Sequence, residues 1–403
     1  MKNINPWLRV FLPFAVGYYL SYLLRNVNAV IAPDLTREFG LTAADLGLLT
    51  SAYLVAFGAF QLPLGILLDR YGARRVEATL LLVTAAGAAM FSLAQNLTQL
   101  VSARAMIGLG VSACLMASFK AFSQWFPLNR QASLNAAIMA AGGMGALTAS
   151  VPLGWALPLI GWRGCFMALS LFAVVAAAGI FGTPDKATSA SKESFLTQLQ
   201  GLGHILGSRV FWRFAPQSAL IVGGFMAIQG LWAVPWLMNF SSYTREVAAT
   251  HLFFMSLGML LGFLFIAAFV TRLEGLGLGP ERLLKVGMGT GMVLGLLILF
   301  DLAPTYLLWS AMGAVFSVGN LSYALLARNF PAHLAGRANT ALNLLAFTGA
   351  FSVQWGFGAV VDWYLTDNAN VHNAYHHAFA VLLALQALSY AWFLWRGRKS
   401  VQG

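Results

Sequence analysis

One arginine inside an apolar segment is the residue whose position most directly suggests chemistry. Arg25 follows a run of apolar residues that begins near residue 10, so in a helix it would lie about 22 Å from that start. A charge that deep in hydrocarbon is costly and often belongs to a functional site. Tyr18, Ser21, Tyr22 and Asn28 recur around it at steps of three and four, which predicts one polar helix face. Its guanidinium could bind a carboxylate, or it could bond carbonyls or another helix.

Other polar and aromatic side chains recur at helical spacing in other apolar segments. Each one alone is more often a packing residue than a ligand, but together they indicate a water-filled cavity. The candidate binding positions of this kind are Tyr53, Gln61, Gln229, Trp232, Asn320, Tyr323 and Asn343. Lys120 is a further candidate at one mouth of such a cavity, where it could attract an anion or extend its ammonium to the membrane surface.

The acidic residues are informative because of where they fall. All of them lie at the charged joints between apolar segments or at the edges of those joints, and Glu77 is assigned to the cytoplasmic side. No carboxylate is expected near the middle of a span, so the sequence predicts no proton-relay residue. His372, His376 and His377 are expected in a solvated outer loop and not in a metal site. We therefore expect no metal and no cofactor.

The elements that position these residues are membrane spans. Of 403 residues, 59% are hydrophobic and 9% charged, and the mean hydropathy is +0.73, which excludes an ordinary soluble domain. A span needs about 20 apolar residues. The sequence therefore predicts an all-α membrane protein with twelve spans, near residues 10–32, 44–67, 76–95, 99–121, 131–156, 163–182, 211–237, 248–270, 283–302, 305–327, 337–361 and 378–395.

The formal charge of +11 follows the topology of the chain and does not indicate a nucleic-acid partner. With both termini in the cytoplasm, the Lys and Arg residues outside the spans fall on that side except for Arg37, Arg163 and Arg245. This is the positive-inside bias of membrane proteins. We expect a bacterial inner-membrane protein that is monomeric and has the lipid bilayer as its surroundings.

A polar interruption divides the spans into six and six. Predicted domains are residues 1–182 and 209–403, joined by a cytoplasmic linker over 183–208 with a short amphipathic helix, Phe195–Leu206. A shift of 204 positions aligns Asn135 with Asn339 and Gly145 with Gly349. The matches fall in the fifth and eleventh spans, as expected for two parallel repeats.

A charged loop between the second and third spans has the sequence Gly-Ile-Leu-Leu-Asp-Arg-Tyr-Gly-Ala-Arg-Arg, residues 65–75. It resembles the signature loop of the major facilitator superfamily, and the fourth span adds a similar Arg-x-x-x-Gly-x-Gly motif. The resemblance implies two six-helix bundles, with Asp69 joining the halves in the outward-open state. Gly65 would allow close helix packing and Gly72 a tight turn. The gating residues implied by the two motifs are Gly65, Asp69, Arg70, Gly72, Arg74, Arg75, Arg104, Gly108 and Gly110.

A narrower resemblance concerns the first span. Tyr22-Leu23-Leu24-Arg25-Asn26 followed by Pro33 is similar to the organic-anion branches of the superfamily, which include organophosphate, anion-symport and nitrate carriers. The resemblance implies that Arg25 contacts the anion. Phosphate-ester carriers have a second arginine in the seventh span, but here the repeat-equivalent of Arg25 is Gln229. This difference argues against a dianionic phosphate.

The expected function is transport of a small organic anion or zwitterion by alternating access, either secondary active or facilitative. The alternatives are an exporter of amphiphilic or drug-like compounds, a dipeptide uniporter and, in a different class, a non-transporting membrane receptor. The sequence contains neither a Gly-x-x-x-x-Gly-Lys-Ser/Thr loop nor a His-Glu-x-x-His motif. We therefore expect no ATP hydrolysis and no enzymatic activity.

Overall fold

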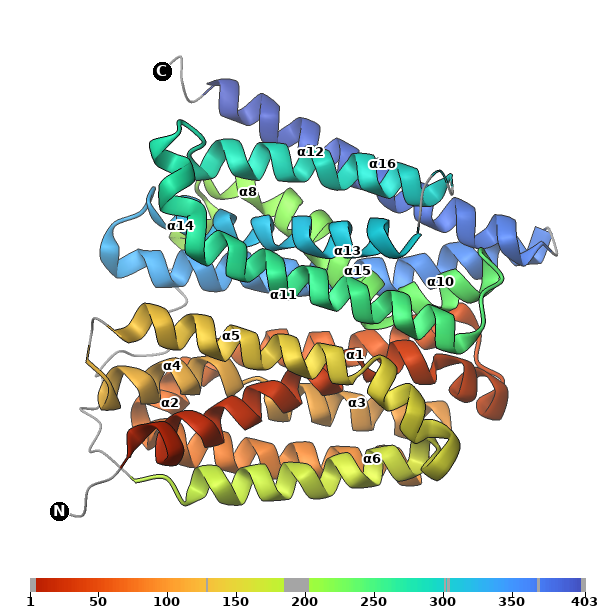
Figure 1. Ribbon diagram of the computed structural model, residues 1–403, viewed down its shortest axis with the longest axis horizontal. Helices are drawn as coiled ribbons and strands as arrows, with labels where there is room; N and C mark the ends of the chain where they lie inside the picture. The colour runs from red at the N-terminus through yellow and green to blue at the C-terminus, as the bar shows by residue number, and fades with distance from the viewer. Residues whose placement is uncertain are drawn as a thin grey trace. The chain divides into compact units, whose positions relative to one another are not determined.

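All regular structure that the protein shows is helical. The computed structural model describes residues 5–127, 130–184, 203–300, 302, 305–367 and 370–399. Within this part of the chain, 11 helices are long and apolar enough to cross a membrane. The expected span at 131–156 begins as α5 (Gln131–Thr148), a helix outside that set. The all-α membrane fold predicted from the sequence is confirmed (Figure 1).

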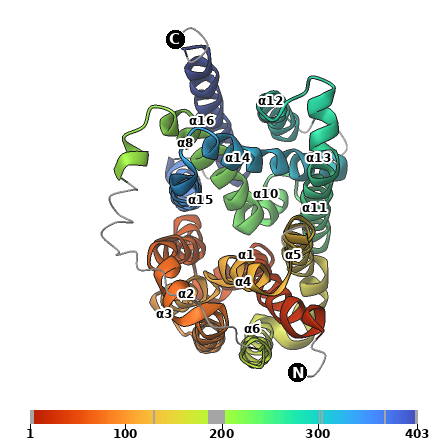
Figure 2. The same ribbon diagram turned by 90° about the vertical axis from the view of Figure 1, so that its left-hand side faces the viewer.

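The chain divides into two compact units. Unit 1 comprises Met1–Phe39 and Ala52–Phe195, and its helices run alongside one another, nearly end-on to the viewer in Figure 2. Its helices are η1 (Trp7–Phe11), α1 (Leu12–Phe39), most of α2 (Ala43–Leu93), α3 (Leu97–Val111), α4 (Cys114–Trp125), α5 (Gln131–Thr148) and α6 (Val151–Phe181).

Unit 2 comprises Gly40–Ser51 and Leu196–Gly403. It therefore includes the first turns of α2, whose backbone amides at Ala43 and Ala44 donate to the Asp362 carboxylate at 3.0 and 2.7 Å. Its other helices are α8 (Phe211–Gln217), η3 (Ser218–Val222), α9 (Gly223–Ala227), η4 (Ile228–Trp232), α10 (Ala233–Asn239), α11 (Arg245–Gly275), α12 (Pro280–Leu299), α13 (Thr305–Phe316), η5 (Ser317–Asn320), α14 (Leu321–Ala327), α15 (Ala332–Asp367) and α16 (Val371–Lys399).

Two glycines with positive φ separate spans that are otherwise continuous. Gly72 has φ 80° inside α2 and Gly161 has φ 65° inside α6. A side chain at either place would be strained in this region of the backbone. The tight turn expected at Gly72 is therefore present, and each of the long helices α2 and α6 is two helices joined at a glycine.

The loop expected between the first two spans is shorter than the sequence suggested. Helix α1 continues through Pro33 to Phe39, and the chain turns at Gly40, where φ is 63°. Asp34 therefore lies within α1 and not in an outer loop. Residues 195–202 of the amphipathic helix expected in the linker lie outside the described residues, whereas 203–206 are helical.

Glycines packed against carbonyls hold corresponding helices together in each unit. In unit 1, a Cβ at Gly145 of α5 would strike the carbonyl oxygen of Tyr19 in α1. In unit 2, a Cβ at Gly349 of α15 would strike the carbonyl oxygen of Ala219 in η3. Small residues permit such close backbone approach in membrane helices. The two glycines that the sequence shift of 204 aligns thus serve the same helix contact within their own units.

Candidate functional site

Arg25 projects from α1 among aromatic rings of unit 1. Its Cζ lies 4.6 Å from the Tyr22 ring centroid and 5.3 Å from that of Phe57. Tyr18 and Tyr53 are its other electrostatic neighbours. Both Tyr22 and Arg25 retain part of their surface. A guanidinium packed over ring faces and hydrogen-bonded to Tyr53 is held in place within the unit.

The tyrosines around Arg25 are fixed by contacts within unit 1. The Tyr53 hydroxyl donates to the Ser21 carbonyl at 3.1 Å, and the Tyr18 hydroxyl lies 3.7 Å from the Met139 sulfur. Tyr18, Tyr53 and Asn28 are buried. The residues of the predicted polar stripe all lie on the continuous helix α1. Only the stripe's Tyr22 and Arg25 positions offer accessible surface, because the remaining positions pack inside the unit.

A second arginine is buried near the first. Arg104 of α3 is wholly buried, and its Nη1 donates to the Leu24 carbonyl at 2.8 Å. Its Cζ lies 5.1 Å from the Tyr53 ring centroid. Its Nε and Nη2 make no hydrogen bond to any described residue. The sequence analysis assigned Arg104 to the fourth-span motif among the gating residues. The structure buries it inside the unit beside Tyr53, which also neighbours Arg25.

The glycines of the same motif explain why Arg104 can lie so deep. A Cβ at Gly108 would strike the Tyr53 carbonyl oxygen, and one at Gly110 would strike the Thr84 hydroxyl. These two glycines therefore let α3 pack directly against α2. Their observed role is close helix packing around Tyr53 and Arg104.

The charged residues of the signature loop bond within unit 1. Lys120 of α4 forms an ion pair with Asp69 at 2.6 Å and donates to the Leu68 carbonyl at 2.8 Å. Arg74 donates to the carbonyls of Phe181 and Thr183 at 3.4 and 3.2 Å. Lys120 is therefore engaged by the loop and does not face the Arg25 site as a second cation.

The remaining loop positions differ in what they contact. Arg70 and Arg75 are exposed, and Arg70 lies over the neighbouring Tyr71 ring at 5.3 Å. A Cβ at Gly65 would meet no atom within 4 Å. The close helix packing expected at Gly65 is thus not present in this structure. Gln61, one turn earlier, donates to the Ser112 carbonyl at 3.0 Å.

Candidate residues of unit 2 mostly bond to one another or to nearby backbone. Gln229 donates to the Ser256 hydroxyl at 3.2 Å, and Trp232 donates to the Gln354 carbonyl at 2.9 Å. The Tyr323 hydroxyl donates to the Asn343 side-chain oxygen at 3.0 Å. The last candidate of this unit, Asn320, is exposed. The structure therefore gathers the Arg25 set in unit 1 but gives Gln229, Trp232 and the Tyr323–Asn343 pair internal partners.

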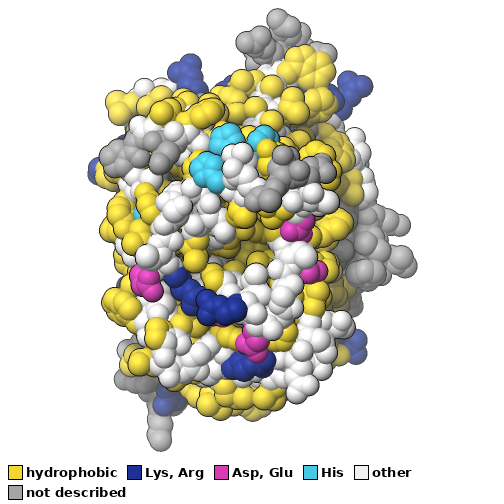
Figure 3. Space-filling model, turned by 90° about the vertical axis from the view of Figure 1, so that its right-hand side faces the viewer, with side chains coloured by type: hydrophobic (Ala, Val, Ile, Leu, Met, Phe, Trp, Pro, Cys, Tyr) yellow, Lys and Arg dark blue, Asp and Glu magenta, His cyan; other side chains and the backbone are white. Residues whose placement is uncertain are grey.

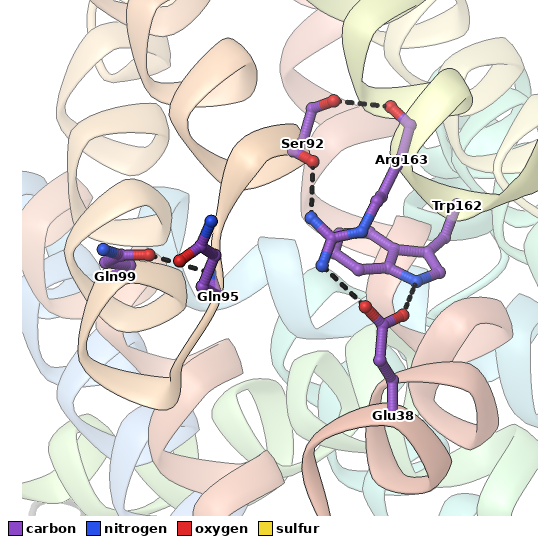
Figure 4. A network of polar contacts seen from close by, with 6 residues as sticks. All are labelled: Glu38, Ser92, Gln95, Gln99, Trp162 and Arg163. Atoms are coloured by element: carbon purple, nitrogen blue, oxygen red, sulfur yellow. Dashed lines mark hydrogen bonds and ion pairs between the residues drawn. The ribbon is translucent and has the colours of Figure 1, made fainter.

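An ion pair joins α1 and α6 near the C-terminal end of α1. Arg163 bonds the Glu38 carboxylate at 2.6 Å, and the Trp162 indole donates to the same carboxylate at 2.8 Å (Figure 4). Arg163 also donates to the Ser92 carbonyl at 2.7 Å. These bonds join α1, α2 and α6, so they are structural contacts away from Arg25.

The three histidines expected in an outer loop lie instead in the first turns of α16, and Figure 3 shows histidines close together on one face. In unit 2, His376 and His377 have ring centroids 5.7 Å apart, and His372 stacks on Phe240 at 4.3 Å. Among the described residues, no group of three or more His, Cys, Asp or Glu side chains is placed to hold a metal ion.

Glu77 is the buried polar residue that the sequence analysis misplaced. It was assigned to the cytoplasmic rim, but the structure buries it completely within unit 1. No N–H or O–H group of a described residue donates to its carboxylate oxygens, and the polar group beside it is the Cys114 thiol. The signal in the sequence is an acid at the start of a long apolar run, Val76 to Val83. Which way it faces depends on the packing of α2.

Fold and site together define a polytopic membrane transporter, with one wholly buried and one partly exposed arginine in unit 1 and a charged loop between the second and third spans. Residues 14–354 match the family model described as Major Facilitator Superfamily, and the chain belongs to this family. The superfamily that the loop motif indicated is therefore confirmed. The protein is an integral membrane transporter and not an enzyme.

Curated relatives include several anion transporters. The chain is 24% identical over 301 residues to the "Hexuronate transporter" of Escherichia coli K12, covering 70% of this chain and 69% of that one. It is 28% identical over 179 residues to the "Probable L-galactonate transporter" of the same strain, covering 44% of this chain but only 39% of that relative's length. A "Probable nitrate/nitrite antiporter NarK1" of Thermus thermophilus is 29% identical over 237 residues, 55% of this chain and 52% of that one.

Solved structures show the same fold over nearly the whole chain. A bacterial homologue of the human lysosomal transporter Spinster matches with a TM-score of 0.76 at 16% identity, covering 99% of both chains. The nucleoside transporter NupG matches with a TM-score of 0.78 at 14% identity, covering 96% of this chain and 99% of that one. At such identities the likeness concerns the fold alone.

Proposed function

We propose that this transporter carries a small organic anion, with Arg25 binding the carboxylate, across a bacterial inner membrane. Transport proceeds by alternating access between the six-span halves 1–182 and 209–399, joined by the linker 183–208. The observation that carries the proposal is that Arg25 and Arg104 both contact Tyr53: Arg25 hydrogen-bonds it and Arg104 lies over its ring.

The two arginines contribute differently. Arg25 keeps accessible surface and can therefore contact a solute. Arg104 is wholly buried and donates to the Leu24 carbonyl, so it cannot contact the solute directly. Its charge can still attract an anion at Arg25, because water screens charges weakly in a protein interior. Two cations beside one tyrosine favour a negatively charged ligand. A guanidinium edge further favours a planar carboxylate that can accept two hydrogen bonds.

The relatives support the charge of the solute. The relatives described above are named for the transport of hexuronate, L-galactonate and nitrate or nitrite, and a "Probable sulfoacetate transporter" of Cupriavidus necator is 28% identical over 153 residues. These solutes differ in size and share a negative charge at neutral pH. We therefore propose a small organic acid as the class of solute, with the sugar acids as the members to test first.

A ligand panel on the purified protein tests this function. A ligand that binds the native state raises its apparent stability, so D-galacturonate, L-galactonate and sulfoacetate are compared in a thermal-shift assay with D-galactose, a dipeptide and an amphiphilic cation. The proposal expects stabilisation by one or more of the acids and none by the uncharged sugar. Stabilisation by the dipeptide or the amphiphilic cation alone would replace it with one of the other transport functions.

A further inference from the structure

Glu77 has no role in the anion site described above, yet its burial is complete. It lies in α2, five residues beyond the turn at Gly72. Its exposed fraction is 0%, and both carboxylate oxygens are buried without an N–H or O–H donor among the described residues. Carboxyl groups are rarely left this way, because burial of a polar atom without a partner is costly.

The surroundings of Glu77 leave space for its carboxyl group. A Cβ at Gly17 of α1 would strike Glu77 Oε1 and would also approach Ile180 of α6 to 3.3 Å. The polar neighbour is the thiol of Cys114 in α4, which is a weak donor. Glycine at position 17 and a small thiol at position 114 thus form a compartment that a carboxyl group fills.

Few charged or titratable groups face this compartment. Helix α4 contributes Cys114, and α1 contributes Tyr18 near that thiol. The neighbouring turns of α6, residues 176–181, contain no titratable side chain. On α2 itself, Arg74 lies three residues before Glu77 and donates to the carbonyls of Phe181 and Thr183. An ionised Glu77 would be a buried charge without a close counter-ion among these groups, whereas the neutral acid is much less costly.

A small pocket near the signature loop is lined by residues of the helices that also surround Glu77. Its lining includes Phe14, Gly72, Ala73, Arg74 and Gln124. Ala73 lies one helical turn from Glu77, and Phe14 lies three residues from Gly17. This arrangement favours proton entry from the end of unit 1 at the signature loop.

Polar groups also connect Glu77 with the anion site. Cys114 interacts electrostatically with both Glu77 and Arg25, and Tyr18 interacts with both Cys114 and Arg25. Gly17 and Arg25 are eight residues apart on α1, which corresponds to about 12 Å along the helix. At an effective dielectric constant of about 20, a unit charge at that distance changes the affinity for a monoanion about tenfold.

We propose that Glu77 is a proton-binding site whose occupancy controls anion affinity at Arg25, so that the transporter moves one proton with its anion. The inference rests on the proposed anion transport. With the proton on Glu77, no negative charge opposes the anion near Arg25, and the anion binds with full affinity. Loss of the proton places a negative charge in the same unit, which weakens binding. Linkage requires that the anion strengthen proton binding by the same factor. A proton and a monoanion together move no net charge.

Infrared difference spectroscopy tests proton binding without a substrate. The wild-type protein in lipid should show a protonated carboxylic-acid band that shifts in D₂O. Glu77→Gln should lack this band while folding normally, since glutamine has nearly the shape of the neutral acid. The control Glu274→Gln, which removes an exposed carboxylate, should leave the band in place. If Glu77→Gln removes no protonated-acid band, Glu77 does not hold a proton and the proposal is wrong.

Anion binding with D-galacturonate as the probe tests the control of affinity. Wild-type affinity should fall about tenfold from acidic to alkaline pH, and Glu77→Gln should keep the high affinity throughout. Cys114→Ser replaces the weak donor with a stronger one that stabilises the carboxylate, so the fall should move to lower pH. An identical pH dependence in wild type and Glu77→Gln contradicts the coupling. If D-galacturonate binds to neither protein, anion transport fails for this probe and the infrared result alone decides whether Glu77 binds a proton.

Discussion

The two units differ in the kind of buried polar group that they leave without a hydrogen bond. In unit 1, two guanidinium nitrogens of Arg104 have no hydrogen bond among the described residues, and no N–H or O–H group there donates to the Glu77 carboxylate. In unit 2, most of the buried atoms without a partner among the described residues belong to neutral side chains, such as the indoles of Trp236 and Trp309. The ionisable groups that are both wholly buried and incompletely bonded thus lie in unit 1.

This difference indicates that the two units contribute unequally to recognition of the solute's charge. A hydrogen bond to a charged group contributes about 1.5–3 kcal/mol, whereas one between neutral groups contributes about 0.5–1.5 kcal/mol. We therefore expect unit 1 to supply the charge recognition of the solute. Neutral residues of unit 2 such as Trp232, whose indole is already bonded to the Gln354 carbonyl, should contribute less to it.

The largest expected effect comes from removing the accessible cation. Arg25→Gln removes the charge and the forked donor, and a hydrogen bond between charged groups contributes about 1.5–3 kcal/mol. The affinity for the carboxylate ligand should fall by about ten- to a hundredfold or more. Arg25→Lys, which keeps the charge without the fork, should lie between wild type and Arg25→Gln. Equilibrium binding to the folded variants measures this order, and equal affinity in all three proteins removes Arg25 from the site.

A smaller effect is expected at the ion pair between Lys120 and Asp69. The side chains are 18% and 43% exposed, so the pair contributes no more than about 1 kcal/mol. Asp69→Asn should shift the conformational equilibrium up to about fivefold and slow transport, with little change in affinity. The alkylation rate of a cysteine introduced at Gln124 reports the shift, with Glu274→Gln as the matched control. An alkylation rate equal to wild type contradicts a gating role.

The smallest effect is expected in unit 2. Tyr323→Phe removes the hydrogen bond to Asn343, which contributes about 1 kcal/mol to stability in a typical case. The melting temperature should fall slightly, and the affinity for the anion should stay within about threefold of wild type. A loss of affinity as large as that of Arg25→Gln would show that unit 2 also binds the charged group, and the contrast between the units would fail.

The sequence predicted those features that depend on a residue's own backbone or on one helix. Gly72 was expected at a tight turn and has φ 80°, because few other residues tolerate that conformation. Gly145 and Gly349 were aligned by the repeat, and each packs against a carbonyl in its own unit. Tyr22 and Arg25 also lie side by side on α1, as predicted, because residues three apart share one helix face.

Features that depend on contacts between distant segments could not be predicted in this way. Lys120 and Asp69 form an ion pair across 51 positions of sequence, and nothing local indicates the pairing. Glu77 follows the charged loop by only two residues, so the sequence analysis assigned it to the membrane surface. Its burial depends on Gly17 and Cys114, which come from two other helices. Helix periodicity alone does not specify which neighbours meet a given face.

The central claim is that Arg25 recognises the negative charge of the solute, and a thermodynamic cycle between protein and ligand tests it most directly. Binding of D-galacturonate and of the uncharged D-galactose is measured by calorimetry for wild type and for folded Arg25→Gln. We predict that wild type favours the acid by about ten- to a hundredfold or more and that this preference largely disappears in the variant. If the variant retains the full preference for D-galacturonate, another group recognises the charge and this account of the site is wrong.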